Sequence, residues 1–273
     1  MLFALLWYYP FCFKEGGKMI EKWKLALREF LKKYEDNDDV IGAILCGSYA
    51  TGNNNEYSDI DVQLVLKDTC NYSSHGVTES NSYLIEYFIN PVSKIKEYME
   101  ENYKRNKQTT QNMFGYGKII YDLEDEVKKL QDLALEYIDK PFETITSKEL
   151  DLYNYRIWDF FDELKALKKE ENPSFNLIYY KLLDKVYEAY CKMQGLPIMP
   201  STRVYKILTD EKFRKNYHVF NLPNEKFTAL YLRCYKDSSV DTMYKNMNNL
   251  INYYYEIQGG FNIRSFSTEI KLD

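Results

Sequence analysis

Two aspartates, two positions apart, have the spacing of a metal-binding pair. Asp59 and Asp61 stand at the start of segment 60–66, in which apolar residues alternate with others. Successive side chains of a strand point to opposite faces, so both carboxylates project from one face. Hard oxygen ligands of this kind suit Mg²⁺ that is held jointly by a protein and by substrate phosphates. The pair therefore predicts a magnesium site for phosphoryl chemistry.

A glycine and a serine end the preceding apolar segment, 40–46. Gly47 and Ser48 form a turn whose backbone N–H groups are accessible to an anion, and the short helix expected after them adds its positive N-terminal end. A lone Gly-Ser or Asp-x-Asp is common and by itself indicates a turn or a solvated strand. Both together, on consecutive predicted strands, favour a phosphate cradle beside a metal site.

This arrangement resembles the DNA polymerase β superfamily of nucleotidyltransferases. The superfamily signature is a strand, Gly-Ser, about ten residues, and then Asp-hydrophobic-Asp, and residues 45–62 match it, Ser58 included. The resemblance implies that Asp59 and Asp61 bind Mg²⁺ and are catalytic. It also implies that Gly47, Ser48 and Ser58 bind the nucleotide.

The superfamily also uses a third carboxylate on a later strand, between apolar neighbours. Glu86 has such neighbours within segment 83–88. The resemblance implies that Glu86 helps to hold the catalytic metal or takes the proton from the acceptor hydroxyl. Glu79 is the rival candidate, and a glutamate that alternates with apolar residues can also simply face solvent.

The chain length, segment 117–122 and a helical second half resemble the bacterial antibiotic (aminoglycoside-type) adenylyltransferases. This resemblance implies an enzyme of the EC 2.7.7 type, which confers antibiotic resistance. It would transfer a nucleoside monophosphate, AMP from ATP, to a hydroxyl of a small molecule such as an aminoglycoside, and release pyrophosphate. Two alternatives stay open: adenylylation of a protein partner, as in toxin–antitoxin systems, and nucleotide binding without catalysis.

The periodicity predicts an α+β chain. A polymerase-β-like domain over 19–140, a mixed sheet with flanking helices, precedes an all-helical domain over 141–273, and Pro141 marks the boundary. Residues 1–18 are expected to be a non-native leader before a natural start at Met19. The predicted elements are a helix over 19–34, strands over 40–46, 60–66, 82–89 and 116–121, helices that begin at Asn90-Pro91 and at Asp122, an apolar helical stripe over 150–167, and helices over 175–190, 224–235 and 240–257.

Acidic residues gather on the first helix of the C-terminal half. Asp151, Asp159 and Asp162 share a stripe with Tyr155, opposite the apolar stripe. The stripe is either a solvated surface or a face that attracts a cationic acceptor, in which case Asp159 and Asp162 bind it.

Composition excludes several classes of function. A net charge of −5 argues against a nucleic-acid partner, and the apolar run over 1–13 is too short to span a membrane. Five scattered cysteines indicate a reducing cytoplasm rather than a disulfide framework or zinc site. His75 and His218 lack evident partners, which favours surface or packing roles. The basic residues that could contact phosphates or simply be solvated are Lys118, Lys181, Lys185 and Arg203.

Overall fold

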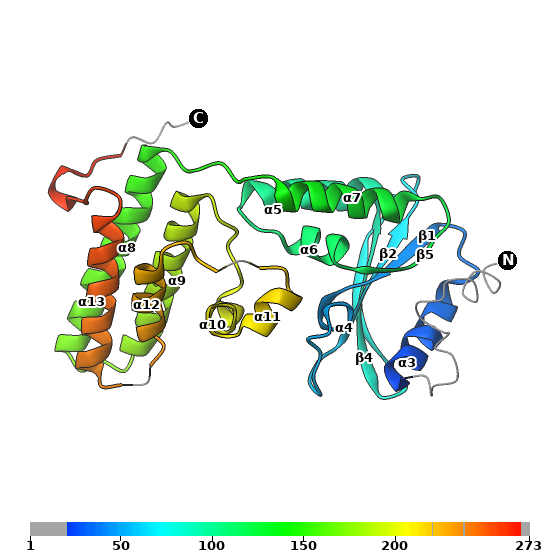
Figure 1. Ribbon diagram of the computed structural model, residues 1–273, viewed down its shortest axis with the longest axis horizontal. Coiled ribbons are helices and arrows are strands. Elements are labelled where there is room, and N and C mark those ends of the chain that lie inside the picture. Colours follow the sequence, from blue (N-terminus) through cyan, green and yellow to red (C-terminus); the bar gives the residue numbers. More distant parts are fainter. Residues whose placement is uncertain (1–20, 220, 237, 269–273) are drawn as a thin grey trace. The chain divides into compact units, whose positions relative to one another are not determined.

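The computed structural model describes residues 21–219, 221–236 and 238–268 (Figure 1). The chain divides into two compact units, residues 1–140 and 141–273. The expected leader, residues 1–18, lies outside the described residues. Each unit has its own apolar core, and each is described separately below.

Unit 1 is built on a five-stranded mixed sheet with the order β3-β4-β2-β1-β5. Strands β2 and β4 are parallel, and the other neighbouring pairs are antiparallel. The strands are β1 Val40–Leu45, β2 Ile60–Leu66, β3 Ser74–Ser80, β4 Tyr83–Pro91 and β5 Lys118–Asp122. The sheet and its flanking helices confirm the predicted α+β, polymerase-β-like fold.

Helices cover both faces of this sheet (Figure 1). Helix α3, Lys22–Leu31, packs on one face and is followed by a 3-10 turn, Lys32–Tyr34. The opposite face is covered by α5 Val92–Lys104, α6 Thr109–Gly115 and α7 Glu126–Asp139. Strand β2 serves both cores, because Val62 and Leu64 pack with α3 while Val65 packs with α5 to α7. Burying each such side chain contributes about 1.5–3 kcal/mol.

Unit 2 is helical, as predicted. Its first helix begins with a capping box, in which Thr146 and Glu149 exchange hydrogen bonds. Gly195 ends the second helix in the left-handed conformation. The elements are α8 Ser147–Lys169, α9 Phe175–Gln194, α10 Ser201–Thr209, α11 Glu211–Asn216, α12 Glu225–Arg233, α13 Val240–Glu256 and a 3-10 turn, Ile263–Ser265.

Within the described residues, the elements that were not predicted are β3, α6, α10, α11 and the 3-10 turn at 263–265. Strand β3 was missed because only Val77 interrupts its polar sequence, which suits an exposed edge strand. A two-residue turn, Asn81-Ser82, joins β3 to β4, and both residues have positive φ, 47° and 64°. Turns of this kind match the twist of a hairpin.

Two predicted helix starts were wrong. Pro91 is the last residue of β4 and the N-cap of α5, so it is not the first helical position. Asp122 ends β5, and Asp125, with a φ of 58°, is the N-cap of α7. The Asp122 carboxylate nevertheless serves this helix end, because its Oδ2 accepts the backbone N–H of Lys128 at 2.8 Å.

Among the helices of the described residues, none has the length and the apolar run that a bilayer crossing demands. Within the same part of the chain, Cys46, Cys70, Cys191 and Cys234 carry free thiols.

Candidate active site

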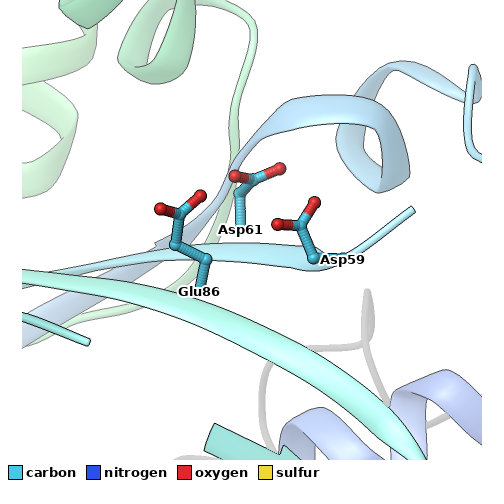
Figure 2. A group of neighbouring side chains, drawn as sticks. All are labelled: Asp59, Asp61 and Glu86. Atoms are coloured by element: carbon cyan, nitrogen blue, oxygen red, sulfur yellow. The ribbon is translucent and has the colours of Figure 1, made fainter. Parts of the chain in front are cut away.

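The aspartate pair lies at the start of β2. Asp59 immediately precedes the strand, and Asp61 is its second residue. Both side chains rise from the same side of the sheet, as the period of a strand requires (Figure 2). On this face of β2 the side chains of Val65 and Gln63 are buried, whereas that of Asp61 is half-buried and partly accessible to solvent. The carboxylates therefore lie where the helix layer ends, so a substrate can reach them.

Glu86 joins the aspartates through the pairing of two parallel strands. Asp61 of β2 is in register with Glu86 of β4. One carboxylate oxygen from each of Asp59, Asp61 and Glu86 lies within 4.8 Å of the others, and all three residues are half-buried. Figure 2 shows the three side chains converging. The group does not include the rival Glu79, which is on β3 and is paired with Leu84 of β4.

The donor set fits a hard divalent cation. Three carboxylates and no histidine or thiol in the group favour oxygen-loving ions such as Mg²⁺ over zinc or copper. Three like charges this close repel one another, and a divalent cation between them relieves that repulsion. Asp59, Asp61 and Glu86 could therefore hold a divalent metal.

The Gly47-Ser48 turn lies against the acidic group. Helix α4, Gly47–Thr51, follows β1 directly, and the backbone N–H of Cys46 donates to the Asp61 carbonyl at 2.8 Å. Gly47 has a φ of 62°, and a Cβ atom there would lie 1.8 Å from Oδ2 of Asp61. Only glycine allows the turn to approach the carboxylate this closely.

Ser48 and Ser58, both predicted to bind nucleotide, have local backbone roles. The carbonyl of Ser48 accepts the backbone N–H of Asn53 at 2.9 Å, which closes the end of α4. The hydroxyl of Ser58 accepts the backbone N–H of Asn55 at 2.9 Å and so shapes the loop before Asp59. Contacts of either serine with a nucleotide stay a prediction.

Cys46 lies beneath the site and is fully buried. Burial raises the pKa of its thiol well above the ordinary value, and the negative charge of Asp61 raises it further. The thiol is therefore protonated at neutral pH, and neither nucleophilic catalysis nor metal binding is expected of it.

His75 was interpreted as lacking a partner, and that interpretation was wrong. Its Nε2 lies 2.8 Å from Oε1 of Glu86. The imidazole also stacks on Phe88, with 4.3 Å between ring centroids and 4° between the planes. The residue was missed because β3 was missed. The hairpin turn at Asn81-Ser82 is the signal that could have found it, since it pairs His75 with Phe88.

The two candidate acceptor residues, Asp159 and Asp162, are exposed on α8. Tyr155 of the same stripe is partly covered, because its ring stacks on Phe266 at 4.7 Å. Asp162 lines a surface cavity of about 1020 Å³, together with Lys165, Lys168 and Lys169. The predicted acidic face is thus mixed in charge at Asp162, and its role in binding an acceptor stays a prediction.

Of the basic candidates, Lys118 lies nearest in register to the glycine-serine turn. It is paired with Leu45, two residues before Gly47. In unit 2, Lys185 forms an ion pair with Glu188 at 3.2 Å, and Arg203 lies over the ring of Tyr217 at 5.2 Å. Local partners account for the latter two side chains.

Comparison with known proteins places this geometry in a family. None of the curated proteins matches the chain. A solved structure of a nucleotidyltransferase-like protein from Exiguobacterium sibiricum 255-15 is similar, with 10% sequence identity and a TM-score of 0.42 over 85% of this chain and 78% of that one. Residues 26–179, more than half of the chain, match the family model described as a nucleotidyltransferase domain. The match begins in α3 and extends into α9. The chain therefore belongs to the nucleotidyltransferase domain family.

Proposed function

We propose that the protein transfers a nucleoside monophosphate, AMP from ATP, to a hydroxyl of a small molecule such as an aminoglycoside, in an Mg²⁺-dependent reaction of the EC 2.7.7 type. The observation that carries this proposal is the convergence of Asp59, Asp61 and Glu86 beside the Gly47 turn. Phosphoryl transfer needs carboxylates that can hold a metal ion and backbone N–H groups that can bind phosphate, and this arrangement places the two side by side.

Each residue has a defined task in this scheme. Asp59, Asp61 and Glu86 hold the metal, while Gly47, Ser48 and Ser58 bind the nucleotide and orient its α-phosphorus toward the acceptor. Bound Mg²⁺ neutralises the charge of the triphosphate and of the transition state. A bond forms between the acceptor oxygen and the α-phosphorus, and the bond from that phosphorus to the β-phosphate oxygen breaks. Pyrophosphate leaves, and the hydroxyl proton passes to Glu86 or to water.

A cationic small-molecule acceptor suits the charge of this chain. The net charge of −5 attracts cations, and Asp159 and Asp162 are exposed carboxylates in the helical unit. Family membership supports a nucleotide substrate. We propose that the biological result of this reaction is antibiotic resistance, through modification of the antibiotic.

The experiment is a screen for pyrophosphate release from ATP, GTP, CTP and UTP, each with a panel of aminoglycosides. We expect release that requires ATP, Mg²⁺ and one class of acceptor, and that is lost in Asp61→Asn. If pyrophosphate is released only when a partner protein is added, the acceptor is a protein and not a small molecule. Nucleotide binding without release under every condition would reduce the protein to a binding module.

A further inference from the structure

We propose that His75 is a positioning residue of the metal site: it donates a hydrogen bond from Nε2 to Oε1 of Glu86 and leaves the other carboxylate oxygen to the metal. The contact is 2.8 Å long. An ionised carboxylate only accepts hydrogen bonds, so the ring nitrogen must be the donor. This inference rests on the proposed function, because it builds on the metal-holding role that the scheme gives Glu86, with water as the acceptor of the hydroxyl proton.

Strand pairing determines where the histidine lies. In the antiparallel hairpin, Val77 is in register with Glu86, and His75 is in register with Phe88. His75 is thus the diagonal neighbour of Glu86 on the same face of the sheet, a separation that a ring can bridge. The parallel pairing of Glu86 with Asp61 continues this row across the sheet. His75, Glu86 and Asp61 therefore follow one another across β3, β4 and β2.

Stacking on Phe88 holds the imidazole in the plane that the hydrogen bond needs. The two rings are nearly parallel, with 4° between their planes. The His75 side chain is still 56% exposed, whereas that of Glu86 is 28% exposed. The ring is consequently a support at the edge of the sheet, and it contributes little to the buried core.

A fixed carboxylate binds metal more tightly than a mobile one. Ordering a glutamate side chain costs conformational entropy. The hydrogen bond from His75 already restricts the Glu86 side chain before metal binds, so metal binding loses less entropy. Hydrogen bonds to ligating carboxylates typically change metal affinity or activity by about 10- to 100-fold. We therefore expect the affinity for metal to depend on the donor at position 75.

Two substitutions separate the hydrogen bond from the stacking. His75→Phe keeps an aromatic ring against Phe88 and removes the donor. His75→Gln removes the ring and keeps an amide N–H that reaches the position of Nε2. Val77→Ala is the matched control, because Val77 is 59% exposed and lies directly opposite Glu86.

The measurement is Mn²⁺ binding to the full chain without nucleotide, followed by electron paramagnetic resonance, with circular dichroism to verify folding. We expect His75→Phe to bind Mn²⁺ about 10-fold more weakly than the parent. His75→Gln should recover most of that loss, and Val77→Ala should match the parent. Parental affinity in His75→Phe, equal losses in His75→Phe and His75→Gln, or no Mn²⁺ binding by the parent would overturn the proposal.

Failure of the proposed function gives a different pattern. If Mn²⁺ binds and responds to position 75 as expected, but no nucleotide is transferred, the positioning role stands and the proposed reaction is wrong. If transfer occurs and His75→Phe keeps the parental affinity for Mn²⁺, only the positioning role is wrong.

Discussion

Gly47 and Asp61 are in such close contact that a Cβ atom at residue 47 would lie 1.8 Å from Oδ2 of the aspartate. The turn after β1 and the face of β2 that carries Asp61 therefore form one structural unit. A side chain at residue 47 would displace the Asp61 carboxylate from its present position.

Replacement of Gly47 by alanine is expected to damage the metal site beyond its cost in stability. The positive φ of 62° alone costs an alanine about 1–2 kcal/mol. Gly52→Ala is the matched control, since Gly52 has a φ of 74° and nothing within 4 Å of its hypothetical Cβ. Both variants should lose thermal stability through the backbone cost, and only Gly47→Ala, whose methyl group also meets Asp61, should lose Mn²⁺ affinity in a titration. Equal affinities in the two variants would show that Asp61 tolerates the added methyl group.

Glu86, and not Glu79, is expected to support metal binding and transfer. Glu86→Gln removes one of three converging charges, and we expect at least a 10-fold loss in Mn²⁺ affinity, roughly as for other changes near metal ligands. Glu79→Gln neutralises an exposed carboxylate of β3 that is outside the group. It should therefore behave like the parent. A larger effect from Glu79→Gln than from Glu86→Gln would show that the third carboxylate is Glu79 of β3 and that its assignment to Glu86 of β4 is wrong.

The position of the aspartate pair beside the glycine-serine turn was predictable from sequence because its signals are local. Asp59 and Asp61 are two residues apart on a strand whose apolar alternation is clear, and Gly47-Ser48 directly follows a buried run. The fold class followed from the same patterns. Glu86 was chosen over Glu79 from its apolar neighbours, and its place beside Asp61 depends on the register between β2 and β4, which no local pattern fixes.

The features that were missed depend on pairing between distant segments. His75 and Glu86 are eleven positions apart, and their contact depends on the Asn81-Ser82 turn. Helix α6 is rich in polar residues but buries Gln111 and Phe114 against other elements of unit 1. The N-cap of α7 is Asp125 and not the predicted Asp122, because β5 extends through Asp122. Tertiary contacts decide each of these cases.

Alkaline pH is expected to destabilise the helical unit. Burial raises the pKa of Tyr190 to about 12, so the folded chain retains a proton that the unfolded chain loses near pH 10. The resulting stabilisation is complete below about pH 10 and disappears as the pH rises toward 12. Denaturant titrations between about pH 9 and pH 12 should show a smaller decline in unfolding free energy for Tyr190→Phe than for the parent.

Tyr190→Phe retains the stacking on Phe227, where the ring centroids lie 3.7 Å apart, so packing is little changed. Tyr57→Phe is the control, because the Tyr57 side chain is 88% exposed. Its decline with pH should match that of the parent. A parental decline in Tyr190→Phe would refute the role assigned to the buried hydroxyl.

The exposed carboxylates of α8 are expected to affect the acceptor and not the nucleotide. Asp159→Asn combined with Asp162→Asn should raise the KM for a cationic acceptor several-fold and flatten its dependence on salt, because less charge attracts the acceptor. The KM for ATP should be unchanged. Glu170→Gln, at the exposed C-cap of the same helix, is the control. A double variant with the parental KM at low salt would make this face a solvated surface only.

The most direct test of the central claim follows the fate of two labels. ATP labelled on either the α- or the γ-phosphate is incubated with Mg²⁺ and each aminoglycoside, using the parent and Asp61→Asn. We predict that the parent attaches the α-label to an acceptor and releases the γ-label in pyrophosphate. Asp61→Asn should neither attach the α-label nor release labelled pyrophosphate. Attachment of the γ-label, transfer by Asp61→Asn at the parental rate, or no transfer to any aminoglycoside would contradict the account.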